Sequence, residues 1–154
     1  MHTKKTIVLI RVFIIVLFTL FLTFKISLKL SKRTVDDFEV RGVDVSAHQG
    51  WIDWKELSEN ELDFAFIKAT EGSSFVDDRF AYNFTHAQKY DISVGAYHFF
   101  SFSSPGVTQA ENFISTVSPF DGMLPPVIDL EFYGDFAVNP LSKEEVDKEL
   151  GSMI

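Results

Sequence analysis

Four short apolar runs alternate with amphipathic stretches along this chain, and this alternation limits its possible folds more than any other feature. The runs are rich in β-branched and aromatic residues and occupy residues 40–45, 64–69, 93–99 and 126–130. Runs of this length and composition are typical of buried strands. Continuous apolar strands separated by helices indicate a parallel sheet covered by helices, either doubly wound or closed into a barrel.

The stretches between the runs carry helix signals. Three helices are predicted at residues 54–60, 79–90 and 106–117. The third is expected to begin with Ser104 as N-cap and Pro105 as its first helical residue. Ser142 and Glu145 form a capping box that predicts a fourth helix running to the C-terminus.

Polar residues interrupt each apolar run near its end. A β/α barrel collects its functional groups at the carboxyl ends of its strands, so these residues are expected to meet at one edge of the sheet. No glycine-rich phosphate loop follows any run, which excludes a dinucleotide-binding domain and a Walker-type nucleotide-binding site. The polar residues are Asp44 and Ser46, then Lys68, Thr70 and Glu71, then Tyr97 and His98, and finally Asp129 and Glu131.

Asp129 and Glu131 are the most informative of these residues, because they lie two positions apart in an otherwise apolar strand. Alternation places both side chains on one face, with Cα atoms about 6.5 Å apart at roughly 3.3 Å per residue. Two buried acids this close are expected to push their pKa values apart. Glycoside cleavage needs one protonated and one ionised carboxyl group. Asp44 is a candidate third acid of the same cleft.

Aromatic residues and a histidine near these acids complete the predicted site. Tyr97 and Tyr133 each combine a ring with a polar group, so both are predicted to contact substrate. A strand-end histidine such as His98 is more often packed and hydrogen-bonded than reactive. A less favoured alternative is a metal hydrolase with Asp44, His98 and Asp129 as ligands.

The N-terminal segment differs from the rest of the chain. Residues 12–24 are uncharged and apolar, with lysines on both sides. Residues 1–30 are therefore predicted to form a signal-anchor or transmembrane helix, because no small-residue cleavage site follows. Residues 31–39 are polar and are predicted to be a linker to a domain at residues 40–154. This organisation predicts a membrane-anchored or secreted protein on the cell-wall side of the membrane.

The charge distribution narrows the choice of partners. Residues 34–154 hold all 22 acidic residues of the chain against seven Lys and Arg. Such an acidic domain repels phosphate backbones, so nucleic acid is not an expected partner. The chain has no cysteine, which excludes disulfides and thiolate chemistry. We expect a monomer.

Four ordered motifs resemble glycoside hydrolase family 25, the muramidase-type lysozymes. They are residues 41–46 (RGVDVS), 66–72 (FIKATEG), 95–99 (GAYHF) and 126–131 (PVIDLE). The resemblance implies a modified β/α barrel of the TIM type, no metal or organic cofactor, and hydrolysis of the β-1,4 bond between N-acetylmuramic acid and N-acetylglucosamine in peptidoglycan.

The resemblance also implies roles for individual residues. Glu131 resembles the general acid of the family. Asp129 resembles the carboxylate that assists the acetamido group of the substrate or stabilises charge, and Asp44 resembles the first-strand acid. Lys68 and Glu71 lie in a matching motif and join Tyr97 and Tyr133 as predicted substrate-binding residues. The predicted partners are peptidoglycan glycan strands and, through the N-terminal segment, a membrane.

The chain departs from the family pattern after its fourth strand. Family members continue with further strands that close the barrel, and a β/α barrel takes at least about 200 residues. The expected fold is therefore an incomplete barrel, the N-terminal part of the family domain, with weak stability and activity by itself. The alternative function is a membrane-tethered peptidoglycan-binding protein without catalysis, a remnant of such an enzyme.

Overall fold

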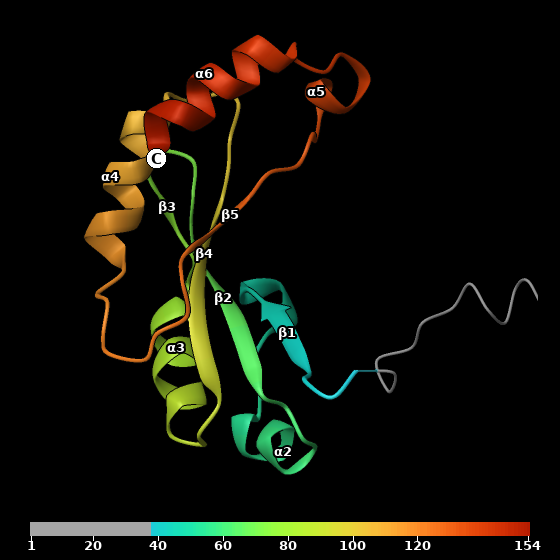
Figure 1. Cartoon of the computed structure of the whole chain (residues 1–154), viewed down its shortest axis with the longest axis vertical. Coiled ribbons are helices and arrows are strands. Elements are labelled where there is room, and N and C mark those ends of the chain that lie inside the picture. Colours follow the sequence, from blue (N-terminus) through green and yellow to red (C-terminus); the bar gives the residue numbers. More distant parts are fainter. Residues whose placement is uncertain (1–37) are drawn as a thin grey trace, which may run out of the picture. The chain divides into compact units, whose positions relative to one another are not determined.

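A parallel sheet forms the centre of the structure, a computed structural model that describes residues 38–154 (Figure 1). Four strands run in the order β1-β2-β4-β5, all parallel to their neighbours, and β3 pairs with β2 in the antiparallel sense. Within the described residues the sheet is open, with β1 and β5 at its edges. The strands are β1 (Gly42–Val45), β2 (Phe64–Glu71), β3 (Phe75–Val76), β4 (Ser93–Phe99) and β5 (Val127–Asp129).

Helices follow the strands, as the alternation predicted. The N-cap side chain of Asp53 accepts a hydrogen bond from Glu56 N at the start of α2, and Ser142 and Glu145 form the predicted capping box of α6. The short elements η2 and α5 were not predicted. The helical elements are η2 (Ala47–Gln49), α2 (Trp54–Glu59), α3 (Phe80–Gln88), α4 (Gly106–Thr116), α5 (Asp135–Val138) and α6 (Lys143–Met153).

The start of α4 corrects one prediction. Pro105 is the N-cap and not the first helical residue, because its ψ of 139° is extended. Gly106 begins the helix at the point where α6 crosses α4 (Figure 1). A Cβ atom at Gly106 would overlap the carbonyl oxygen of Glu149, so only glycine lets the two helices approach this closely.

The hydrophobic core lies on the helix-covered face of the sheet. Ala65, Ile67 and Ala69 alternate along β2 and are fully buried. They belong to one cluster with Trp54 of α2 and Phe84 of α3. Alternation therefore turns the intervening residues of each strand to the opposite face.

That opposite face is crowded by two aromatic rings of β2. Phe64 lies opposite Gly42 of β1, and Phe66 lies opposite Gly95 of β4. A Cβ atom at either glycine would overlap the neighbouring ring. The glycines thus let both rings lie over adjacent strands on the face that carries Asp44.

The predicted membrane segment at residues 1–30 lies outside the described residues, as does most of the predicted linker at residues 31–39. Among residues 38–154, none of the helices combines the length and apolar character that a membrane span requires. Residues Val40–Ile154 form one compact unit.

Candidate active site

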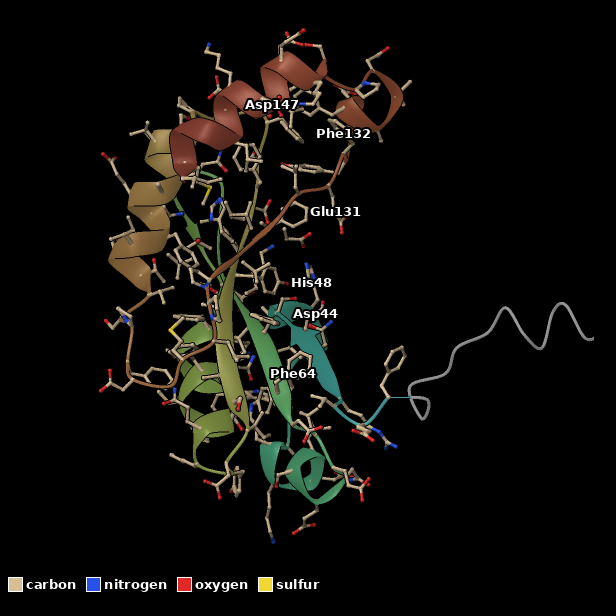
Figure 2. All side chains as sticks on the ribbon, in the orientation of Figure 1. Asp44, His48, Phe64, Glu131, Phe132 and Asp147 are labelled. Atoms are coloured by element: carbon tan, nitrogen blue, oxygen red, sulfur yellow. The ribbon has the colours of Figure 1, made fainter. Side chains whose placement is uncertain are left out.

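The three predicted acids line one hollow at the carboxyl ends of the edge strands. Asp44 is the third residue of β1, Asp129 is the last residue of β5, and Glu131 lies two residues beyond. The hollow has a volume of 360 Å³, and Phe66 and Tyr97 also line it. Figure 2 shows Asp44 and Glu131 on the same side of the sheet, with His48 just past the end of β1.

The backbone holds Asp129 in place. It pairs with Phe99 across the β4–β5 ladder, and its carbonyl oxygen accepts a hydrogen bond from Phe100 N at 2.9 Å. Asp129 is half-buried, whereas Asp44 and Glu131 are exposed to the solvent of the hollow. The structure thus brings the three acids to one hollow, but β5 ends at Asp129 and Glu131 is exposed beyond it, so the expected pair of buried acids within one strand is not formed. Their catalytic roles stay a prediction.

Tyr97 is a buried phenol among these carboxylates. Burial raises its pKa to about 12, and the negative charges of Asp44, Asp129 and Asp77 act in the same direction. A hydrogen bond with the Ser46 side chain opposes this rise. At neutral pH the phenol therefore keeps its proton, and it can donate a hydrogen bond within the hollow.

Ser46 and Asp77 support this arrangement; Ser46 was expected at this edge of the sheet, whereas Asp77 was not singled out from the sequence. Ser46 is the N-cap of η2, directly after β1. Asp77 is buried and accepts hydrogen bonds from Ala47 N and Arg79 N, both at 2.9 Å. It therefore ties the segment after Asp44 to the start of α3. No sequence pattern pointed to Asp77, because its partner Ala47 lies 30 residues away.

Lys68 and Glu71, two predicted substrate-binding residues, bind each other. The Lys68 ammonium donates to Glu71 at 2.6 Å and lies 4.8 Å from the centroid of the Phe99 ring and 5.6 Å from that of Phe75. Lys68 is buried and Glu71 is partly exposed. Neither residue lines the hollow of the acids, so contact with substrate stays a prediction for both.

Tyr133 lies beside the hollow rather than in its lining. Its hydroxyl donates to Ser101 Oγ at 3.1 Å, and its ring packs against Phe99 with centroids 5.2 Å apart. These contacts hold the chain just after Glu131 against the loop after β4. The predicted contact of Tyr133 with substrate stays untested.

His98 points to the other face of the sheet, and this overturns the metal-hydrolase alternative. The side chain is fully buried, with Nδ1 2.7 Å from Thr70 Oγ1 and Nε2 2.9 Å from Gln109 Oε1. Burial lowers its pKa, although the hydrogen bond with Gln109 and the charge of Glu71 oppose this shift. Successive strand residues face opposite ways, so His98 cannot join Asp44 and Asp129 around one ion. This burial agrees with the packed interpretation. Among residues 38–154, no group of three or more acids and histidines is arranged to hold a metal ion.

Fold and site together define a β/α protein whose carboxylates converge at the carboxyl ends of a parallel sheet. A sequence model described as Glycosyl hydrolases family 25 matches residues 43–153. The chain therefore belongs to glycosyl hydrolases family 25, which confirms the resemblance seen in the four motifs.

Individual relatives agree with this assignment. A solved family 25 glycosyl hydrolase from Bacillus anthracis superposes with a TM-score of 0.76 at 55% identity, over 79% of this chain and 56% of that structure. Lysozyme M1 of Streptomyces globisporus is 42% identical over 62% of this chain and 34% of its own length. The uncharacterized protein YegX of Escherichia coli K12 is 38% identical over 69% of this chain and 41% of its own length. The chain thus spans less than half of both sequence relatives.

Proposed function

We propose that this protein is a peptidoglycan muramidase, which hydrolyses the β-1,4 bond between N-acetylmuramic acid and N-acetylglucosamine. The observation that carries the proposal is the convergence of Asp44, Asp129 and Glu131 on one hollow of a family 25 sheet. Similarity to Lysozyme M1 supports the same substrate class. The activity would serve degradation or remodelling of the cell wall.

In the proposed mechanism each of the three acids has a different role in glycoside cleavage. Glu131 is the general acid that protonates the leaving oxygen. Asp129 orients the substrate's acetamido group or stabilises the positive charge that develops at the sugar ring, and Asp44 adds negative charge from the opposite edge of the hollow. Tyr97, protonated at neutral pH, donates a hydrogen bond that holds a carboxylate or the sugar in position.

The proposed location follows from the substrate. Peptidoglycan lies outside the cytoplasmic membrane, so the domain would act on the extracytoplasmic side. The apolar N-terminal segment at residues 1–30 would export the protein and tether it to the membrane.

Replacement of Glu131 by Gln tests the proposal. The amide keeps the shape of the side chain but cannot donate a proton as an acid, so release of new reducing ends from purified cell walls should fall at least about 100-fold. Glu144→Gln is the matched control, because Glu144 is an exposed residue of the first turn of α6 and should leave the rate unchanged.

Two results would contradict the proposal. An unchanged rate in Glu131→Gln would remove Glu131 from the mechanism. Wall binding by the parent chain without any new reducing ends would instead support the alternative of a non-catalytic, membrane-tethered wall-binding protein.

A further inference from the structure

A second hollow, lined largely by aromatic residues, lies between α2 and α3 and shares no residue with the hollow of the acids. It has a volume of 340 Å³, within the usual range of ligand pockets. Trp51 is 67% exposed and Tyr90 is 39% exposed, which is unusual for such large rings gathered at one depression. The lining residues are Trp51, Ile52, Asp53, Trp54, Tyr82, His86 and Tyr90.

Contacts within the protein hold the aromatic side chains of this hollow in place. Tyr82, His86 and Tyr90 are spaced four residues apart and share one side of α3 and the residues directly after it. The rings of Tyr82 and His86 stack at 4.0 Å, and Trp51 meets Tyr82 edge-on at 4.7 Å. The Tyr82 hydroxyl donates to the carbonyl oxygen of Ile52 at 3.1 Å. Side chains fixed in this way lose little entropy when a ligand binds.

Polar groups lie at the edges of these rings. Asp53 also lines the hollow; its Oδ1 caps α2 by accepting from Glu56 N, and its second carboxylate oxygen can accept a hydrogen bond from a ligand. His86 Nδ1 donates to the Tyr82 carbonyl oxygen at 2.9 Å, and among residues 38–154 its Nε2 has no protein partner. Trp51 and Tyr90 leave ring surface exposed beside these polar groups. Such a combination matches a pyranose ring, which has C–H faces and a rim of hydroxyl groups.

The charge around Trp51 argues against a cationic ligand. Aromatic pockets with a carboxylate can bind quaternary ammonium groups through cation–π contacts. Here the Arg79 guanidinium already lies 3.7 Å from the centroid of the Trp51 ring. A second cation at this ring would be repelled, and the Asp53 carboxylate in the lining disfavours an anion. A neutral sugar is therefore the better occupant.

We propose that this hollow, formed by Trp51, Asp53, Tyr82, His86 and Tyr90, is a second glycan-binding site for an N-acetylhexosamine chain. The inference deepens the proposed function, since the ligand is the polymer that the acids would cleave. Trp51 follows Asp44 by seven residues, so their Cα atoms are at most about 25 Å apart.

The two tryptophans provide an internal test, because Trp51 and Trp54 are the only ones in the chain. The full-length chain carrying Glu131→Gln would be titrated with tetra-N-acetylchitotetraose, and the indole N–H signals followed by NMR. We expect the exposed Trp51 signal to shift with ligand. The Trp54 signal should shift less, although Trp54 also lines the hollow, because the residue is 1% exposed and its indole nitrogen donates to Asn83 at 3.1 Å.

Variants provide the second measurement. Trp51→Ala and Tyr90→Ala should each weaken calorimetric binding to this site at least tenfold, and Trp51→Phe should restore part of it. Phe120→Ala is the matched control, because Phe120 is an aromatic residue with 40% exposure outside this hollow. Far-ultraviolet circular dichroism would confirm that each variant is folded.

Three outcomes would overturn the proposal: an unshifted Trp51 signal at saturating glycan, affinity within twofold of the parent in Trp51→Ala, or displacement of the glycan from the Trp51 site by tetramethylammonium. Failure of the muramidase proposal would look different. In that case walls would not be cleaved by the chain with Glu131 intact, while Trp51-dependent glycan binding would persist.

Discussion

Tyr97 illustrates how the surroundings of a single residue set its chemistry. The phenol is buried beside three carboxylates, and burial and these charges raise its pKa to about 12. A tyrosine in water would lose its proton near pH 10. The shift therefore matters in alkali, where the folded chain keeps the proton on a group whose anion Asp44 and Asp129 would repel.

This shift predicts a specific loss of stability in alkali. Between pH 10 and 12 the unfolded chain has released the Tyr97 proton while the folded chain still holds it, so the free energy of unfolding should fall as pH rises through this window. Tyr97→Phe should reduce this slope, as measured by urea denaturation at several pH values. Tyr90→Phe is the control, and an equal effect of both variants would contradict the assignment.

At the scale of elements, the crossing of α4 and α6 depends on one small residue. Gly106→Ala should destabilise the fold by about 1–3 kcal/mol, because the added methyl group forces the backbone of α6 away. Gly151 lies in α6 with open space around it, so Gly151→Ala should instead stabilise the helix, by at most about 1 kcal/mol. Thermal unfolding should give a lower melting temperature for Gly106→Ala and a higher one for Gly151→Ala.

The strands and helices show how much of the fold could be predicted from the sequence. The four parallel strands and the four longer helices followed from apolar runs and caps such as Ser142. The strand Phe75–Val76 and the helix Asp135–Val138 were too short to leave a periodic pattern. Strand alternation placed Asp129 correctly, but it does not place Glu131, because β5 ends at Asp129 and not at the predicted residue 130.

Contacts between distant segments could not be predicted in this way. The hydrogen bond from Ala47 to Asp77 and the packing of Trp51 on Tyr82 each join segments about 30 residues apart. Such pairs depend on how the loops after β1 and β3 fold back over α3. The four-residue spacing of Tyr82, His86 and Tyr90 was the one local signal of the aromatic hollow.

For the whole molecule, charge should govern the approach to a cell wall. Residues 34–154 carry 22 acidic groups against seven basic ones, so walls that bear phosphate polymers should repel this domain. Raising the salt concentration from about 0.01 to 0.15 M shortens the Debye length from about 30 to about 8 Å. Binding of the Glu131→Gln chain to such walls should therefore increase with salt.

Sedimentation of the chain with purified walls measures this effect. Walls stripped of their phosphate polymers serve as the control and should show a much smaller salt dependence. Weaker binding at higher salt on the phosphate-bearing walls would mean that attraction, from the basic N-terminal segment for instance, outweighs repulsion.

The β4–β5 ladder stops at Asp129, which leaves the two neighbouring acids with unequal freedom. Backbone pairing restrains Asp129, whereas Glu131 belongs to the connection that leads into α5. Small backbone adjustments after residue 129 can therefore reorient one carboxyl group without displacing the other. Under the proposed mechanism, sequence changes in this connection would alter the position of Glu131 against the departing sugar and leave Asp129 in place.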